Sequence, residues 1–135
     1  FSTAPVPASA AAAAAGIRFV QSRPGAERCA RLWERVEQLR GGLGSFPTGE
    51  RLSAIIPLII GEETRAVEAA TRLRERSIFL PAIRYPTVAS GQARLRVTLT
   101  AAHTEGDVKE LLAALESLGL VGARERNATP ISNLK

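Results

Sequence analysis

The sequence predicts an α+β protein, in which a helical arm precedes a small two-layer domain with a three-stranded, mainly antiparallel sheet and helices on one of its faces. Three observations predict this class. Two segments near the start have helical patterning. Apolar runs of strand length lie at 54–60 and 78–84, and an alternating run lies at 93–100. Amphipathic helical segments follow the first and the last of these runs.

Length and composition agree with one domain plus an arm. The chain has 135 residues, of which 45% are hydrophobic and 23% charged, which is globular and not disordered composition. The net charge of +5 comes almost wholly from arginine, because Lys109 and Lys135 are the only lysines. One cysteine, Cys29, and one histidine, His103, exclude an internal disulfide framework and a metal site built from several of these residues. We predict no metal. Methionine is absent, and we expect the chain to belong to something longer.

The predicted arm occupies residues 1–50. Its first seven residues should be extended, because residues that precede proline avoid the α region. Ser9 is the expected N-cap of an alanine-rich helix. A second helix is predicted over 26–39, with its apolar stripe on Cys29, Leu32, Trp33, Val36 and Leu39. A glycine cluster should end it, formed by Gly41, Gly42 and Gly44.

The predicted domain occupies residues 51–120. Its first strand, 54–60, contains Pro57, which indicates an edge position or a bulge. A helix is expected over 62–75, and a second strand over 78–84. Thr104 and Asp107 have the spacing of a capping box that opens the last helix, and residues 121–135 are expected to be a tail.

The alternating strand at 93–100 carries the first candidate site. Its apolar residues should face the helices, which leaves Arg94 and Arg96 together on the other face. Two guanidinium groups on one face can bind a carboxylate or a phosphate. A solvated outer face of an antiparallel sheet has the same pattern, so spacing alone leaves both interpretations open.

A second candidate is Arg84, at the end of the 78–84 strand, followed by Tyr85, Pro86 and Thr87 in a loop. Loops at strand ends often carry binding residues, although a structured turn has the same pattern. Lys109 lies on the polar side of its helix and indicates no Schiff-base lysine, which would need burial. The glycine cluster at 41–44 follows a helix and not a strand, which is the wrong context for a phosphate-binding loop.

Charge and hydropathy limit the partners. No apolar run reaches the ~18 residues of a membrane span, so we predict no membrane partner. The basic balance leaves open a stand-alone module that binds nucleic acid or another anion. Aromatic residues make up only 4%, and arginines alternate with glutamates, so we predict no nucleic-acid partner. A single cysteine and no recognisable export signal favour the cytoplasm.

Three stretches resemble the C-terminal domain of the α-oxoamine synthases, which are pyridoxal-phosphate enzymes of fold type I. They are FSTAPVPA at 1–8, SAIIPLIIG at 53–61 and AIRYPTVASGQARLRVTLTAAHT at 82–104. Within that family they most resemble the branch that condenses L-alanine with a pimeloyl thioester to 8-amino-7-oxononanoate, with loss of CO₂, in biotin synthesis. Gly91 to Arg94 and His103-Thr104 also occur in the 2-amino-3-ketobutyrate ligases, which are the nearest alternative branch.

The resemblance implies roles for four residues. Arg96 matches the arginine that holds the carboxylate of the amino-acid substrate. Thr87 matches a threonine of the substrate site, and Arg84 matches an arginine near the acyl-chain end. Thr3 matches a hydroxyl that reaches the phosphate of the cofactor from the neighbouring subunit of a homodimer. The acyl donor implied is pimeloyl-CoA or a pimeloyl carrier protein.

The resemblance also implies what the chain lacks. The family's cofactor lysine, its ring-stacking histidine and the aspartate at the pyridine nitrogen belong to a large domain that matches none of these residues. Pyridoxal phosphate needs that lysine for its Schiff base and the acid for its electron sink. We therefore expect no catalytic residue in this chain, and expect the chain alone to be inactive.

Overall fold

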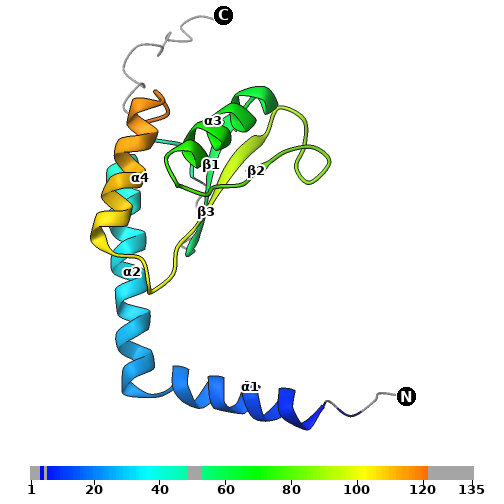
Figure 1. Ribbon diagram of the computed structural model, residues 1–135, viewed down its shortest axis with the longest axis vertical. Helices are drawn as coiled ribbons and strands as arrows, with labels where there is room; N and C mark the ends of the chain where they lie inside the picture. The colour runs from blue at the N-terminus through cyan, green and yellow to red at the C-terminus, as the bar shows by residue number, and fades with distance from the viewer. Residues whose placement is uncertain (1–3, 5, 49–52, 122–135) are drawn as a thin grey trace, which may run out of the picture.

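A computed structural model of the chain describes residue 4 and residues 6–48 and 53–121. Within them the order is helix–helix–strand–helix–strand–strand–helix, as Figure 1 shows. The elements are α1 (Pro7–Val20), α2 (Arg23–Leu43), β1 (Ile55–Gly61), α3 (Glu63–Glu75), β2 (Ala82–Ile83), β3 (Ala93–Thr98) and α4 (Glu105–Ser117). The α+β class predicted from the sequence is confirmed.

Helix α1 projects away from the rest of the molecule (Figure 1). It begins at Pro7 after the N-cap Val6, and the prediction of Ser9 as the N-cap was wrong. Proline fits the first turn of a helix because its missing N–H has no partner there in any case. None of the α1 residues is buried, and Ile17 and Val20 expose 59% and 69% of their surface. Alanine propensity, and not burial, therefore accounts for this helix.

Helix α2 is longer than the predicted 26–39 at both ends. Ser22 caps its start, where its Oγ accepts a hydrogen bond from the backbone N–H of Gly25 at 3.3 Å, and Pro24 lies within the first turn. A Cβ on Gly25 would lie 2.1 Å from the carbonyl oxygen of Phe19, so the sharp corner between α1 and α2 requires glycine there. At the other end the helix stops before Gly44, whose φ is +57°.

The sheet has the order β1-β3-β2, with β3 antiparallel to both neighbours. This confirms the three-stranded antiparallel sheet. The strand expected over 78–84 is reduced to Ala82–Ile83, so that prediction was wrong in length. Pro81 has no N–H for the ladder, although its carbonyl oxygen still accepts from the backbone N–H of Arg96 at 3.0 Å.

Pro57 lies on the edge strand β1, as predicted, opposite Arg96 on β3. The backbone N–H of Leu99 bonds the carbonyl oxygen of Ala54, so the N–H groups of β1 alternate between β3 and the outer edge. At residues 55, 57 and 59 the N–H position faces outward. The missing donor of proline therefore costs the sheet no hydrogen bond.

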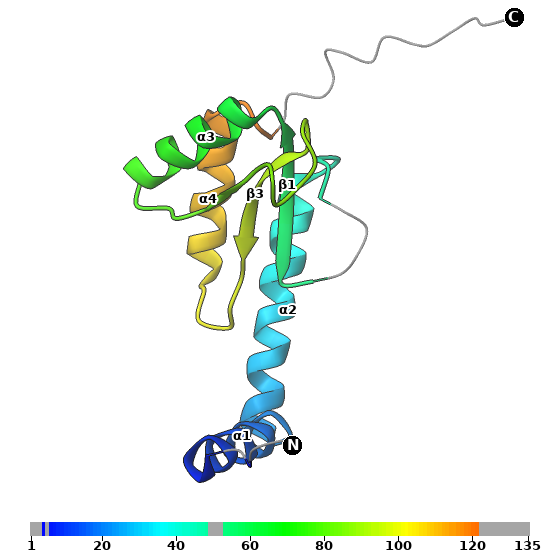
Figure 2. The ribbon, with the colours of Figure 1, turned by 90° about the vertical axis from the view of Figure 1, so that its right-hand side faces the viewer.

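The helices cover one face of the sheet. Alternate strand residues are buried there, namely Ile56 and Leu58 of β1 and Ala93, Leu95 and Val97 of β3. They join one core with apolar residues of α2, α3 and α4 and of the loops, among which the fully buried are Val36, Leu39, Leu73 and Leu115. Figure 2 shows the sheet beside α2 and α4, with α3 at one end of them.

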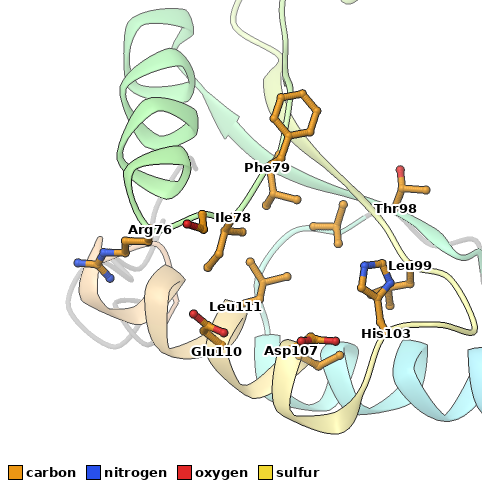
Figure 3. Close-up of a pocket in the computed structure, with 13 residues that line it drawn as sticks. Arg76, Ile78, Phe79, Thr98, Leu99, His103, Asp107, Glu110 and Leu111 are labelled. Atoms are coloured by element: carbon orange, nitrogen blue, oxygen red, sulfur yellow. The ribbon is translucent and has the colours of Figure 1, made fainter.

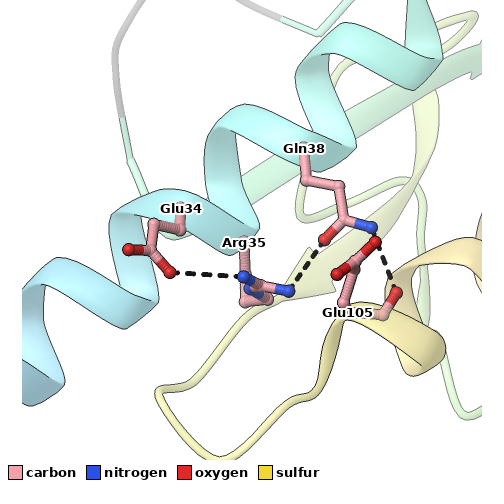
Figure 4. Close-up of polar contacts among 4 residues, drawn as sticks. All are labelled: Glu34, Arg35, Gln38 and Glu105. Carbon is pink, nitrogen blue, oxygen red and sulfur yellow. Dashed lines mark hydrogen bonds and ion pairs between the residues drawn. The ribbon is translucent and has the colours of Figure 1, made fainter.

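The second half of α2 belongs to this core, where it packs against α4. Figure 4 shows the contact: Gln38 donates from Nε2 to the backbone carbonyl of Glu105 at 3.0 Å. Arg35 donates to Oε1 of Gln38 at 3.1 Å and pairs with Glu34. Only α1 and the first turns of α2 thus project as an arm.

Helix α4 begins as the sequence predicts. Thr104 Oγ1 accepts from the backbone N–H of Asp107 at 3.2 Å, and Oδ2 of Asp107 accepts from the N–H of Thr104 at 2.7 Å. The hydrogen bonds from Thr104 hold the pKa of the Asp107 carboxyl below its usual range. The predicted capping box is confirmed.

Candidate functional site

The face of the sheet opposite the helices carries the candidate site. We call it the open face, and it comprises Ile55, Pro57, Ile59, Ile83, Arg94, Arg96 and Thr98. Its members alternate with the buried strand residues, which is why the pleat turns them away from the helices. It holds two arginines and no carboxylate, so an anion meets positive charge there on an apolar sheet surface.

Arg96 lies near the middle of this face and is exposed. Its backbone is fixed between Pro57, its register partner on β1, and the carbonyl of Pro81. Neither proline offers a polar side chain to its guanidinium, and no carboxylate among the described residues pairs with it. A planar anion can therefore meet the full fork of donors. The sequence shows both prolines, but only the register reveals that they flank Arg96.

Arg94 lies two residues earlier on the same strand and face. Its register partners are Ile59 on β1 and Ile83 on β2, so its stem runs between two aliphatic side chains. Its Nε donates to the backbone carbonyl of Gln92 at 2.9 Å. The sequence did not predict this bond, because its acceptor is a backbone carbonyl, which every residue has.

Arg84 and Thr87 close the turn that follows β2. The backbone N–H of Thr87 donates to the carbonyl of Arg84 at 2.9 Å, across a cis Tyr85–Pro86 peptide bond. Both side chains are exposed. Since Ile83 is the register partner of Arg94, the turn starts one residue beyond Arg94 on the neighbouring strand. The register thus brings the backbones of Arg84 and Arg94 to the same end of the sheet.

Arg96 lies further from that turn. It faces Pro81, and Arg84 is three residues further along that segment, which is roughly 10 Å at about 3.3 Å per residue. Thr3, the fourth residue singled out from the sequence, lies outside the described residues. The described part of the candidate site is therefore Arg96, Arg94 and the turn from Arg84 to Thr87.

A cavity of about 290 Å³ lies elsewhere, beside the end of β3 and the start of α4 (Figure 3). Three of its polar lining groups are already used within the fold. Nδ1 of His103 accepts from the backbone N–H of Thr100 at 2.9 Å, Asp107 caps α4, and Arg76 donates to the hydroxyl of Ser117. Its floor is aliphatic, and it contains none of the four residues predicted for the site.

Other chemistry is limited in the described part of the chain. Lys109, on the exposed side of α4, pairs with Glu105, and this contact lowers the pKa of the Glu105 carboxyl. Cys29 is exposed. No group of three or more His, Cys, Asp or Glu side chains among the described residues could hold a metal ion. No helix of that part is long and apolar enough to cross a membrane.

The profile of a known protein family, aminotransferase class I and II, matches residues 1–115. This chain belongs to the aminotransferase class I and II family. The match covers the arm, the sheet and nearly all of α4, and so includes every residue of the candidate site.

Curated relatives in this family share its sequence closely. An 8-amino-7-oxononanoate synthase of Klebsiella pneumoniae (strain 342) is 46% identical over 121 residues, which are 88% of this chain and 31% of that protein. One of Dechloromonas aromatica (strain RCB) is 45% identical over 120 residues, or 87% of this chain and 30% of that protein. The chain thus spans about a third of the length of these relatives.

Solved structures share the fold. The serine palmitoyltransferase of Sphingomonas wittichii aligns with a TM-score of 0.75 at 27% identity, over 90% of this chain and 32% of that one. The enzyme from S. paucimobilis, solved with bound PLP, aligns with 0.75 at 26%, over the same shares. An 8-amino-7-oxononanoate synthase from Francisella tularensis aligns with 0.56 at 22% over 67% of this chain and 27% of that one, and shows the fold alone.

The described residues do not by themselves fit pyridoxal phosphate. The cofactor needs a lysine for its Schiff base and an acid at its ring nitrogen. Lys109 is the only lysine of the described part, and its exposed ammonium is paired with Glu105, away from the sheet. The open face has no carboxylate. No chemical step on the cofactor is assigned to this part of the chain.

Proposed function

We propose that this chain is the substrate-binding, C-terminal part of a pyridoxal-phosphate-dependent α-oxoamine synthase. The whole protein condenses L-alanine with a pimeloyl thioester to 8-amino-7-oxononanoate and CO₂, in the cytoplasm and as a homodimer. The observation that carries the proposal is Arg96. It is an exposed cation on the open face that pairs with no carboxylate of the described residues, in a chain 46% identical to an 8-amino-7-oxononanoate synthase.

In this proposal Arg96 binds the carboxylate of L-alanine. Two parallel N–H···O bonds fix the plane of that carboxylate, and so the direction of the bond from Cα to the carboxyl carbon. The apolar neighbours Pro57, Ile55 and Ile59 keep the surroundings of the charge pair poor in competing polar groups. Orientation of this bond is the contribution of the chain to the loss of CO₂.

Arg84 and Thr87 serve the acyl donor and the substrate pocket. Their turn is fixed by the N–H groups of Thr87 and Val88, both of which donate to the carbonyl of Arg84. Arg84 faces the acyl-chain end, where pimeloyl-CoA or a pimeloyl carrier protein brings a terminal carboxylate. Thr87 supplies a hydroxyl to the same pocket.

The cofactor and its lysine, histidine and aspartate belong to the large domain of the whole protein in this proposal. Thr3 reaches the cofactor phosphate of the neighbouring subunit. The arm comprises α1 and the first turns of α2, and the small domain comprises residues 53–120 together with the second half of α2, which packs into its core. The 135-residue chain alone is inactive and forms no lysine-linked cofactor absorbance band.

The test is a steady-state assay of the whole purified protein, supplied with pyridoxal phosphate, L-alanine and pimeloyl-CoA, with the product identified by mass spectrometry. Arg96→Gln should raise KM for L-alanine by about 10–100-fold, since a charge-assisted hydrogen bond contributes roughly 1.5–3 kcal/mol. KM for pimeloyl-CoA should change little. Arg65→Gln, on α3 at the covered face, is the matched control.

Failure of the unmodified protein to form 8-amino-7-oxononanoate would contradict the assigned reaction. Efficient use of glycine with acetyl-CoA instead would favour the 2-amino-3-ketobutyrate ligase branch. An unchanged KM for L-alanine in Arg96→Gln would remove Arg96 from the site.

A further inference from the structure

Arg94 is a second fixed cation on the open face, and the role assigned to Arg96 does not use it. Its Nε is committed to the carbonyl of Gln92 at 2.9 Å, which leaves its two terminal amino groups available. No carboxylate of the described residues forms an ion pair with it, and its stem is only half-buried between Ile59 and Ile83. The guanidinium is therefore held in place with no counter-charge.

The bond to Gln92 also sets the direction of the side chain. Gln92 precedes Arg94 on the chain, so the guanidinium leans toward the start of β3 and away from Arg96. That end of the strand is where the turn from Arg84 to Thr87 lies, because Ile83 is the register partner of Arg94. Directly opposed Cα atoms are about 5 Å apart and one further residue adds about 3.3 Å, which puts the Cα atoms of Arg84 and Arg94 roughly 6 Å apart.

Two arginine charges at this backbone separation, neither of them paired with a carboxylate of the described residues, repel each other in the free protein. An anion bound between them removes that repulsion and gains charge-assisted hydrogen bonds to a planar fork. The pair is thus a second anion-binding position, separate from the one at Arg96.

We infer that Arg94, together with Arg84, binds an anionic group of the acyl donor: the terminal carboxylate of the acyl chain or a phosphate of its carrier. The inference rests on the proposed function and adds Arg94 to it as a residue that determines donor specificity. Arg96 holds the amino acid, and Arg94 holds the other substrate.

The spacing suits a carboxylate-terminated chain. The Cα atoms of Arg94 and Arg96 are about 6.6 Å apart, and the lean toward Gln92 adds to the distance between their guanidinium groups. Three backbone bonds advance about 3.5 Å, so the six carbon–carbon bonds of a pimeloyl chain span roughly 7 Å. An amino acid on Arg96 and the end of such a chain near Arg94 are thus within reach of one another.

The test compares Arg94→Gln with the unmodified whole protein on three acyl donors, at saturating L-alanine. The donors are pimeloyl-CoA, which carries both anionic groups, heptanoyl-CoA, which lacks the terminal carboxylate, and the heptanoyl thioester of N-acetylcysteamine, which lacks both. With pimeloyl-CoA the substitution should raise KM by tenfold or more, while KM for L-alanine stays within twofold. Arg94→Lys should restore part of the loss, and Arg65→Gln should behave as the unmodified protein.

The donor at which the penalty disappears identifies the source of the anion. Loss of the penalty with heptanoyl-CoA assigns the terminal carboxylate, and loss only with the N-acetylcysteamine thioester assigns the carrier phosphate. An equal penalty with all three donors, or none with pimeloyl-CoA, overturns the inference and leaves Arg94 a structural residue. A protein that makes no product before substitution contradicts the proposed function instead, so the two failures differ.

Discussion

The six residues of β3 alternate between two faces of the sheet, and the two faces differ in burial and in charge. Leu95 and Val97 are fully or almost fully buried under the helices, whereas Arg94 and Arg96 lie on the open face. On the covered side Leu95 and Val97 belong to one core with apolar residues of the helices and of β1. On the open side Arg94 donates to the backbone carbonyl of Gln92. Neither Arg94 nor Arg96 pairs with a carboxylate of the described residues.

This difference separates stability from function along one strand. Burial of apolar area stabilises the fold at roughly 25 cal/mol per Å², and the covered face supplies it. The arginines add little to folding, because solvent screens exposed charges. Substitutions on the covered face should therefore change the free energy of unfolding, and substitutions on the open face should change substrate binding.

The largest expected effect is on the covered face. Leu95→Ala should lower the free energy of unfolding by about 3 kcal/mol, because a fully buried leucine leaves a cavity in addition to its lost transfer energy. Urea unfolding followed by circular dichroism checks it. A loss below about 1 kcal/mol would mean that the covered face is not the packed one.

A smaller loss is expected at the cap of α4, which helps cover that face. Thr104→Ala should cost about 1 kcal/mol, because the N–H of Asp107 loses its acceptor at the first turn. Thr104→Ser keeps a hydroxyl and is the matched control. Equal stability of the alanine and serine variants would show that the cap contributes nothing.

A still smaller effect depends on pH. The pKa of Asp107 is lowered in the folded chain by hydrogen bonds from Thr104, so its contribution is present above its unfolded value and is lost as pH falls through the lowered one. Asp107→Asn should therefore unfold at a lower temperature than the unmodified chain at pH 7, with the gap closing toward pH 2. Thermal melts over that range test it, and a gap that does not depend on pH contradicts it.

The smallest change in stability is expected on the open face. Arg96→Gln should shift the free energy of unfolding by no more than about 0.5 kcal/mol, because its side chain has no partner among the described residues. The same variant should still lose its affinity for the amino acid. A large loss of stability in Arg96→Gln would mean that the arginine serves the fold.

The alternation of residues 93–100 was enough to predict both faces and the antiparallel class. The capping box at Thr104 was also readable, because its hydrogen bonds are local. The length of β2 was not, since residues 78–83 are all apolar and only the register with β3 shows that pairing is confined to Ala82 and Ile83. Likewise, the start of α1 depended on how Pro7 fits a first turn, which propensity did not resolve.

For the site, residue type and resemblance led to Arg96, Arg84 and Thr87, and the structure adds where they lie. The sequence indicated Arg94 only as the neighbour of Arg96 on the same strand face. Its difference from Arg96 comes from the local bond to the carbonyl of Gln92 and from the register with Ile59 and Ile83, and residue type reveals neither. Thr3, outside the described residues, stays a prediction.

The outer edge of β1 has a consequence for how copies of the chain meet. Its run of Ile55 to Ile60 is the most apolar strand sequence in the chain, which is the kind that recruits a further strand and seeds aggregates. Each outward N–H position is already taken or absent: Ile55 donates to Ser53 Oγ at 3.0 Å, Pro57 has no hydrogen, and Ile59 donates to the carbonyl of Pro47 at 3.1 Å. An incoming strand finds no donors there, so this edge is protected against sheet extension while its isoleucines remain on the surface.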